Sequence, residues 1–230
     1  MTFAPRTPAG ELPDQGMARI FLRPIANPLP LGFVGLAGAS MMLSGMQLGW
    51  VPISEATQVG IAVIVIAAPL QLIACVMGFL ARDPATATGM GTQAVSWLTI
   101  GILTLLPGTR SAALGYVLFY LAAAVLASAL MAMLGKAVVG LVLAVTAARF
   151  AITGIYQYFG GSGWMYVTGW LGIALAGLAV YAVVALELEG VLHRTILPTL
   201  RAGMGRQALS GEGTTTIGAV EKDPGVRAQL

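Results

Sequence analysis

The sequence predicts an all-α fold, a bundle of six transmembrane helices with both termini in the cytoplasm. Of its 230 residues, 57% are hydrophobic and only 9% are charged, and the mean hydropathy is +0.86. A soluble domain averages about 25% charged residues, so these charges are too few to cover a water-exposed surface. The apolar residues also fall into six segments of about 20 residues, the length that crosses roughly 30 Å of hydrocarbon.

Short turns mark the limits of the six predicted spans. The first span follows two closely spaced prolines, and the third follows an Arg-Asp-Pro-Ala turn at 82–85. The fourth follows 107–111, the fifth follows Gly-Lys at 135–136, and the sixth follows the glycine-rich turn 159–163. Helices joined so tightly are expected to be antiparallel neighbours. The predicted spans are 31–50, 57–81, 86–106, 112–134, 137–158 and 164–188.

Charge placement predicts the orientation of the bundle in a cell membrane. Cytoplasmic loops of membrane proteins carry an excess of Lys and Arg. One side of the predicted bundle has only Arg110, with Trp50, Trp164 and Tyr166 at the expected interface. The other side, predicted to be cytoplasmic, has Arg6, Arg19, Arg23, Arg82, Lys136, Arg194, Arg201 and Arg206.

The sequence divides into a membrane domain and two polar tails. Residues 27–198 form the predicted six-helix domain, and we expect 1–26 and 199–230 to be flexible cytoplasmic tails. The one cysteine, Cys75, lies in a span and cannot form an intrachain disulfide. No basic run indicates nucleic-acid binding, and no ligand cluster indicates a metal or cofactor. Nor does a nucleophile–base pair or paired carboxylate indicate an enzyme.

Arg149 is the most informative single residue. It lies near the middle of the fifth span, where a charge costs roughly 2.5–3.5 kcal/mol. We therefore expect it to face the protein interior, where its planar guanidinium can hold a carboxylate through two hydrogen bonds. The alternative is a structural role, with hydrogen bonds to helix carbonyls or neighbouring polar side chains. The sequence favours neither interpretation.

Other polar side chains also lie at interior depths of the predicted spans, and some of them share a helix face. Gln93 and Ser96 are three residues apart, and Thr146 and Thr153 flank Arg149 on one stripe. Such stripes indicate either interhelical hydrogen bonds or a solute path. Glu187 and Glu189, at the cytoplasmic end of the sixth span, are candidates for proton coupling or simply solvated acids. The polar residues at interior depths are Gln71, Thr92, Gln93, Ser96, Thr99, Thr146 and Thr153.

Several segments resemble the acetate uptake transporter family, the six-helix acetate and succinate carriers of bacteria, archaea and fungi. The first is Asn27-Pro28-Leu29-Pro30-Leu31-Gly32, which resembles the family signature Asn-Pro-x-Pro-Leu-Gly. Gln71, the stretch Trp97-Leu98-Thr99 and the stretch Gly169-Trp170-Leu171-Gly172 also match family positions. Tyr181 and the stretch 194–198 loosely resemble the terminal pattern of the family. The resemblance covers residues 26–198.

This resemblance implies a six-helix protomer, commonly assembled as a homo-hexamer, with a substrate path through each protomer. Family members move acetate and sometimes succinate, by proton coupling or by channel-like conduction. The family constriction usually contains a Phe and a Tyr, whereas this chain has Leu36 and Gln93 there. These departures make acetate selectivity less certain than transport itself.

The combined hypothesis is a transporter of small carboxylate anions. Asn27, Pro28 and Pro30 are expected to shape the cytoplasmic vestibule. Leu36 and Gln93 would then form the constriction, with Gln71, Ser96, Arg149 and Thr153 along the same path. The alternatives are a channel for other small anions or neutral solutes, and a non-transporting membrane scaffold or sensor with the same fold.

Overall fold

The computed structural model describes residues 25–201 except 107, 109 and 193. Its elements are six long helices and one short 3-10 helix, and the described residues contain no strand. The all-α prediction and the number of long helices are confirmed. In chain order the elements are α1 (Leu29–Gln47), η1 (Ile53–Glu55), α2 (Ala56–Leu80), α3 (Pro84–Leu105), α4 (Ala112–Met133), α5 (Ala137–Phe159) and α6 (Ser162–Leu192).

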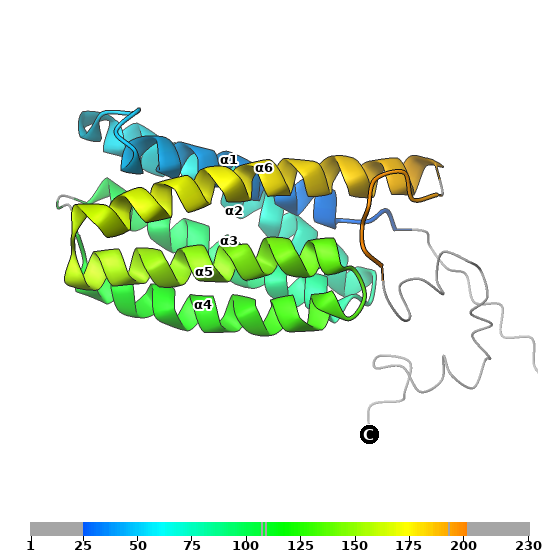
Figure 1. Cartoon of the computed structure of the whole chain (residues 1–230). Coiled ribbons are helices and arrows are strands. Elements are labelled where there is room, and N and C mark those ends of the chain that lie inside the picture. Colours follow the sequence, from blue (N-terminus) through cyan, green and yellow to red (C-terminus); the bar gives the residue numbers. More distant parts are fainter. Residues whose placement is uncertain (1–24, 107, 109, 193, 202–230) are drawn as a thin grey trace, which may run out of the picture.

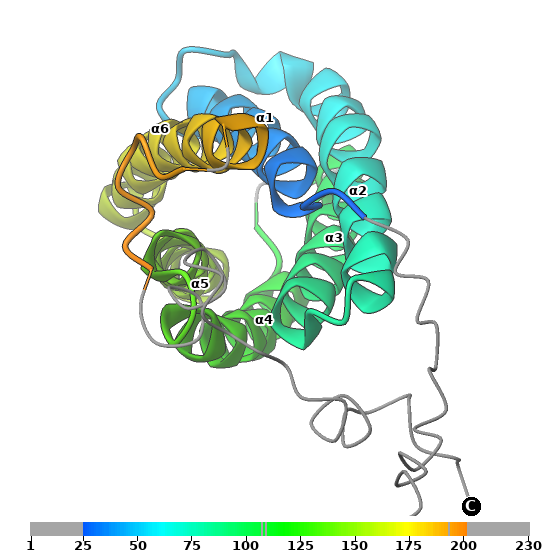
Figure 2. The same cartoon turned by 90° about the vertical axis from the view of Figure 1, so that its right-hand side faces the viewer.

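The six helices form a ring in chain order. Each helix packs against the next one, and α6 returns to pack against α1 (Figure 2). Residues 25 and 201 lie at the same end of the bundle, which we call the terminal end (Figure 1). The connections α1–α2, α3–α4 and α5–α6 lie at the opposite end, which we call the far end.

Most helix limits differ from the predicted spans by one to four residues, and the start of α3 and the end of α6 are two examples. α3 begins at Pro84 rather than residue 86, because proline fits the first turn of a helix and Asp83 caps it. The Asp83 carboxylate accepts hydrogen bonds from the backbone amide of Thr86 (3.0 Å) and from its hydroxyl (2.7 Å). α6 runs to Leu192, four residues past its predicted end, and its 31 residues span about 46 Å at 1.5 Å each.

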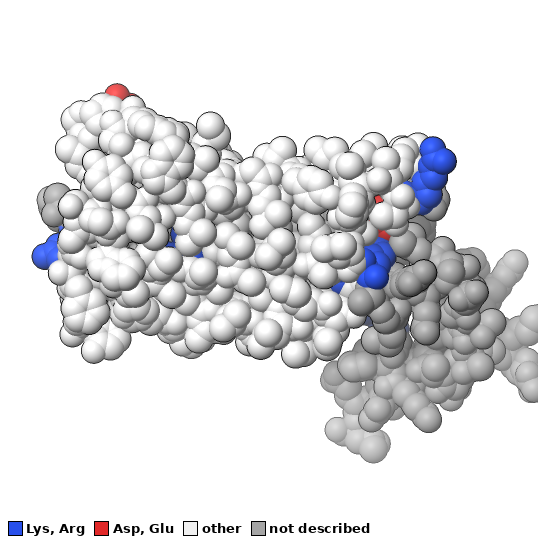
Figure 3. Space-filling view, in the orientation of Figure 1, with Lys and Arg blue, Asp and Glu red and all other residues white. Residues whose placement is uncertain are grey.

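Five of the six helices are long and apolar enough to cross a membrane. The exception is α3, whose 22 residues are the least apolar of the six. The face of the bundle in Figure 3 is almost free of charge, and the charged side chains seen there lie mainly at its two ends. These features support a membrane protein with several spanning helices. α3 differs from the other five long helices in its more polar composition.

Glycine allows two neighbouring helices to touch through their backbones. A Cβ built on Gly60 of α2 would lie 2.9 Å from the carbonyl oxygen of Gly101 on α3. A Cβ built on Gly101 would lie 3.0 Å from the carbonyl oxygen of Gly60. Small residues permit this approach in membrane bundles, where packing rather than the hydrophobic effect holds helices together.

A C-terminal strap, residues 194–201, leads from the end of α6 to the start of α5. The carbonyls of Leu200 and Thr199 accept hydrogen bonds from the first amides of α5, those of Ala137 (3.2 Å) and Val138 (3.3 Å). A helix has no internal acceptor for these amides, so the strap caps α5. The tail predicted to begin at residue 199 therefore starts with three residues that pack on the bundle.

Charged groups meet where the strap reaches the bundle. Arg201 forms an ion pair with Glu189, which is buried near the end of α6. Beside them, Lys136 precedes α5 and forms an isolated β-bridge with Arg201. Burial, followed by the charge of Arg201, lowers the pKa of Lys136 below the usual lysine value. The strap therefore joins α5 and α6 through backbone and side-chain contacts.

Candidate functional site

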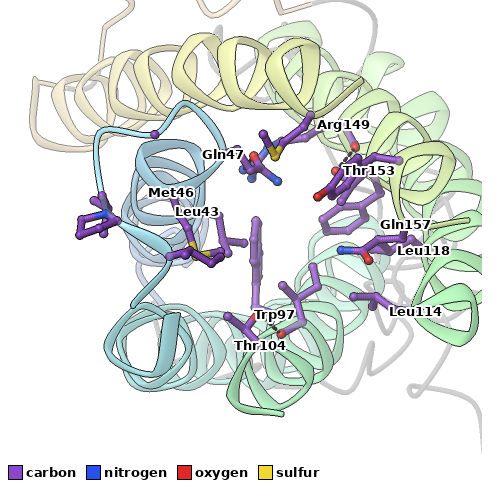
Figure 4. Close-up of a pocket in the computed structure, with 18 residues that line it drawn as sticks. Leu43, Met46, Gln47, Trp97, Thr104, Leu114, Leu118, Arg149, Thr153 and Gln157 are labelled. Carbon is purple, nitrogen blue, oxygen red and sulfur yellow. Dashed lines mark hydrogen bonds between the residues drawn. The ribbon is translucent and has the colours of Figure 1, made fainter. Parts of the chain in front are cut away.

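A cavity of about 380 Å³ lies in the half of the bundle nearest the far end. Side chains from α1, α3, α4, α5 and α6 line it, and the α1–α2 connection lies at its outer side. Figure 4 shows Gln47, Trp97, Arg149, Thr153 and Gln157 gathered around the same space. The remaining walls are mainly apolar, which is typical of a site for a small molecule. This cavity is the candidate functional site.

Among the described residues that line the cavity, Arg149 is the one with a charged side chain. The side chain is 2% exposed and lies near the middle of α5, as predicted. Its guanidinium donates hydrogen bonds to α1, at Ser40 Oγ (3.2 Å), the Ser40 carbonyl (3.4 Å), Ser44 Oγ (3.2 Å) and Gln47 Oε1 (3.4 Å). These contacts match the structural interpretation of Arg149, because the acceptors are a helix carbonyl and neighbouring polar side chains.

The positive charge of Arg149 is nevertheless uncompensated. No carboxylate in the described part of the chain lies within ion-pair distance of it. Its Nε is buried without a hydrogen-bond partner. A buried charge without a partner of opposite charge is costly, because it has lost its hydration without gaining an ion pair. The site therefore combines a cavity, a cation and no protein anion.

Gly172 of α6 makes room for the guanidinium. A Cβ built on Gly172 would lie 2.6 Å from Arg149 Nε and 2.7 Å from its Cζ, closer than real Cβ contacts. The absence of a side chain here lets the guanidinium lie between α1 and α6. Gly172 belongs to the stretch that resembles the acetate transporters. Its contact with the guanidinium explains physically why a residue without a side chain is needed at this position of this chain.

Trp97 and Phe150 close the inner side of the cavity. Both rings are at most 1% exposed, and they pack edge to face with centroids 5.6 Å apart. The guanidinium carbon of Arg149 lies 5.6 Å from the centre of the Trp97 ring, within the range of a cation–π interaction. Trp97 was part of the resemblance, but no pattern in the sequence indicated that it lies in the site.

A pair of glutamines lies deeper in the bundle. Gln71 of α2 donates from Nε2 to Gln93 Oε1 of α3 (2.8 Å) and to the carbonyl of Gly32 (3.4 Å). Both side chains are fully buried. Gln93 precedes Trp97 by one turn of α3, so it lies about 6 Å nearer the terminal end. The structure thus brings Gln71 and Gln93 together, and their hydrogen bond joins α2 to α3.

The residues of the first motif lie at the terminal end. Asn27 Oδ1 accepts a hydrogen bond from the amide of Leu29, the first residue of α1 (3.2 Å), which is the expected use of this side chain. Pro28 precedes the helix and Pro30 lies in its first turn. A cavity of about 120 Å³, lined partly by Leu29 and Lys136, lies at this end. Leu36 is fully buried two turns further along α1.

The other predicted site residues are more dispersed. Thr153 lines the large cavity, and its hydroxyl donates to the carbonyl of Arg149 (2.7 Å). The Ser96 hydroxyl donates to the carbonyl of Thr92 on its own helix (2.7 Å). Glu187 is exposed, whereas Glu189 is 4% exposed and paired with Arg201. Neither acid lines the large cavity.

A second cavity, of about 300 Å³, adjoins the first at the far end. The two share Met46, Thr104, Leu114 and Gln157 on their walls, and the second also contains Arg110. Gln157 accepts a hydrogen bond from the amide of Ser111 (2.9 Å), which joins α5 to the α3–α4 connection. A cationic side chain thus also lies toward the outer side of the candidate site.

The fold is similar to that of a solved structure described as the bacterial acetate channel SatP. The two structures align with a TM-score of 0.68 and 21% sequence identity, over 76% of this chain and 99% of that chain. At this identity the likeness establishes a shared fold, and it supports the resemblance to acetate transporters noted in the sequence. No protein-family model matches the sequence, and neither does any curated protein.

Proposed function

We propose that this chain, which shares the fold of a bacterial acetate channel, passes small carboxylate anions such as acetate across a cell membrane. The observation that carries the proposal is Arg149, a buried cation on the wall of a cavity without a protein carboxylate beside it. A carboxylate in the cavity would supply the missing charge, since guanidinium and carboxylate match in shape and charge. The fold and the cavity chemistry thus support the same substrate class.

The proposed path runs through the centre of the helix ring. From the far end, an anion passes Arg110, reaches Arg149 and Thr153, and then meets the rings of Trp97 and Phe150. Beyond them lie Leu36, Gln71, Gln93 and Ser96, followed by the vestibule near Asn27, Pro28 and Pro30. Cavities at both ends and fully buried side chains between them support a path that is closed at its middle.

In the same proposal, all six helices span the membrane and the terminal end faces the cytoplasm. The polar side chains of α3 that lower its hydropathy include Gln93 and Ser96, which are buried within the bundle rather than exposed to lipid. Four described cations, Arg82, Lys136, Arg194 and Arg201, lie at the terminal end, against Arg110 at the far end. This distribution supports cytoplasmic termini.

The mode of transport and the assembly are extensions of the proposal. Channel-like conduction is compatible with the fold likeness, and proton-coupled symport with Glu187 or Glu189 is the alternative. Succinate is a second candidate substrate, and a homo-hexamer is proposed from the family resemblance. A proton gradient that raises acetate accumulation above equilibrium would favour symport, and the mass of the detergent-solubilised particle would give the number of protomers.

The test is uptake of labelled acetate into proteoliposomes by the wild type, Arg149→Gln and Arg149→Lys. Hydrogen bonds to a charged group contribute about 1.5–3 kcal/mol, so we expect Arg149→Gln to lower uptake at sub-saturating acetate roughly tenfold or more. Arg149→Lys keeps the charge without the planar donor fork, so it should retain part of the uptake. Wild-type uptake no greater than that of empty liposomes would overturn acetate as substrate.

The hydrogen bonds from Arg149 to α1 favour one second candidate, a scaffold in which this residue only ties helices together. A scaffold predicts that Arg149→Gln lowers thermal stability while the wild type transports no small anion or neutral solute. Uptake by the wild type of nitrate, but of neither acetate nor formate, would instead identify a channel for other small anions. Each result separates one alternative from the proposal.

A further inference from the structure

We propose that Trp97 is a substrate-binding residue, whose indole N–H donates a hydrogen bond to the carboxylate held at Arg149. The inference rests on the proposed function and assigns a second ligand to the same site. Trp97 would also set specificity, because it presents a donor and an apolar ring to one small molecule. Neither role follows from the sequence motif in which Trp97 occurs.

The first argument is that the indole nitrogen of Trp97 lacks a partner. The side chain is fully buried, and Nε1 has no hydrogen bond within the described residues. Tryptophan N–H groups usually find an acceptor when they are buried. Such an orphan group in a native structure calls for a ligand, an ordered water or a functional role. The N–H of Trp97 therefore lacks an acceptor, and a bound molecule would reach it when the side chains packed around it shift.

The second argument is proximity to the cation. Trp97 and Arg149 line the same cavity, and the guanidinium carbon lies 5.6 Å from the ring centre. A carboxylate has two oxygens with about four acceptor positions, so it can accept from both side chains at once. The protein acceptors near Arg149, on Ser40, Ser44 and Gln47, are bonded to the guanidinium. A bound anion would provide an acceptor for the indole.

The third argument concerns the rest of the substrate. Leu43, Leu118 and Phe150 lie on the same cavity wall as Trp97. An aliphatic carboxylate would place its oxygens at the two donors and its alkyl group against these apolar side chains. A chloride ion fits the donors but gains nothing from the apolar wall, and a neutral amide lacks the charge that Arg149 requires. The cavity thus favours short aliphatic carboxylates over both.

The fourth argument is that the Trp97 ring lies across the path. It packs on Phe150, and the next turn of α3 carries Gln93, whose Nε2 is also buried without a partner. A carboxylate that leaves Arg149 toward the terminal end would pass from the indole N–H to this amide N–H. These two donors without partners lie one turn apart on α3, so they would provide two successive hydrogen-bonding positions for an anion.

The test is NMR of the full chain in lipid nanodiscs with ¹⁵N-labelled indoles, titrated with acetate. The chain has four tryptophans, and Trp97→Phe identifies the Trp97 signal. We expect a saturable shift of the Trp97 N–H proton, with the signals of Trp50, Trp164 and Trp170 unmoved. Acetamide, the neutral control, should give no shift, and Arg149→Gln should abolish the acetate shift.

Uptake provides the second measurement. Trp97→Phe keeps an aromatic ring beside Phe150 and removes the N–H donor together with part of the indole volume, so the thermal stability of the variant is measured beside its uptake. Since a hydrogen bond to a charged group is worth about 1.5–3 kcal/mol, we expect about a tenfold or larger rise in half-saturating acetate. Acetate uptake by the wild type together with an unmoved Trp97 signal would overturn this inference and leave the proposed function intact. Absence of both uptake and shift would overturn both.

Discussion

Arg149 of α5 reaches across the candidate site to α1, where its guanidinium donates hydrogen bonds to Ser40, Ser44 and Gln47. Its depth in a span predicted an interior position, and the structure confirms this. Its acceptors Ser40, Ser44 and Gln47 were missed, although they lie at i, i+4 and i+7 on α1 and so share one helix face. This spacing could be seen in the sequence. The sequence did not show that Arg149 of α5 would reach this face of α1, because that depends on how the ring of helices closes.

At the same scale, Gly172 gives a prediction about the space around the guanidinium. Gly172→Ala would place a methyl group against Ser44 Oγ and 2.6 Å from Arg149 Nε, so the Ser44 hydroxyl and the guanidinium that it binds must both shift. We expect a loss of about 1–3 kcal/mol, typical of overpacking, together with reduced acetate uptake. Thermal unfolding in detergent and proteoliposome uptake measure the two effects.

Gly177→Ala on the same helix is the matched control. A Cβ at Gly177 meets nothing within 4 Å, so this variant should unfold and transport like the wild type. Equal behaviour of Gly172→Ala and Gly177→Ala would contradict the proposed fit of the guanidinium against α6. A change in both variants would instead indicate a general effect of alanine on α6.

At the scale of elements, hydropathy predicted the positions of the helices more accurately than the residues at which they begin and end. A hydropathy profile detects where a chain leaves the hydrocarbon, whereas a helix ends where its backbone hydrogen bonds stop. α6 therefore continues through Glu187 and Glu189 to Leu192. α3 shows the converse case. Its polar side chains lower its hydropathy without shortening the helix, because Gln93 and Ser96 find partners inside the protein.

The glutamine pair predicts how α2 and α3 are coupled. Gln93→Leu leaves the buried Gln71 amide without its 2.8 Å acceptor, so we expect a loss of about 1–3 kcal/mol. Replacing both residues by Leu removes donor and acceptor together and should restore much of this loss. Thermal unfolding of the two single variants and the double variant measures the coupling. Strictly additive losses would show that the pair contributes no interaction energy.

For the whole molecule, the sequence predicted helices that neighbour one another along the chain, but not how the bundle closes. Short turns indicate that each helix lies beside the next, and they contain no information on the contact of α6 with α1. That contact, seen in the ring of Figure 2, places Gly172 beside the α1 acceptors of Arg149. The candidate site therefore depends on the least predictable contact of the fold.

The strap gives a prediction at this scale. A chain that ends at residue 198 loses the two carbonyls that cap α5 and leaves the buried Glu189 without Arg201. We expect a lower unfolding temperature, corresponding to a loss of about 1–3 kcal/mol for the unpaired groups. A chain that ends at residue 201 keeps these contacts and should unfold at a higher temperature than the chain that ends at residue 198. Equal unfolding temperatures for the two shortened chains would contradict the stabilising role of the strap.

The position of the strap also bears on biosynthesis. A chain is made from its N-terminus, so α5 is complete well before Thr199 and Leu200 are added. During that interval the first amides of α5 lack the acceptors that they have in the finished protein. The terminal end can therefore reach its final form only after α6 has been inserted and its C-terminal extension has folded back. Completion of this end of the bundle thus follows the synthesis of all six helices.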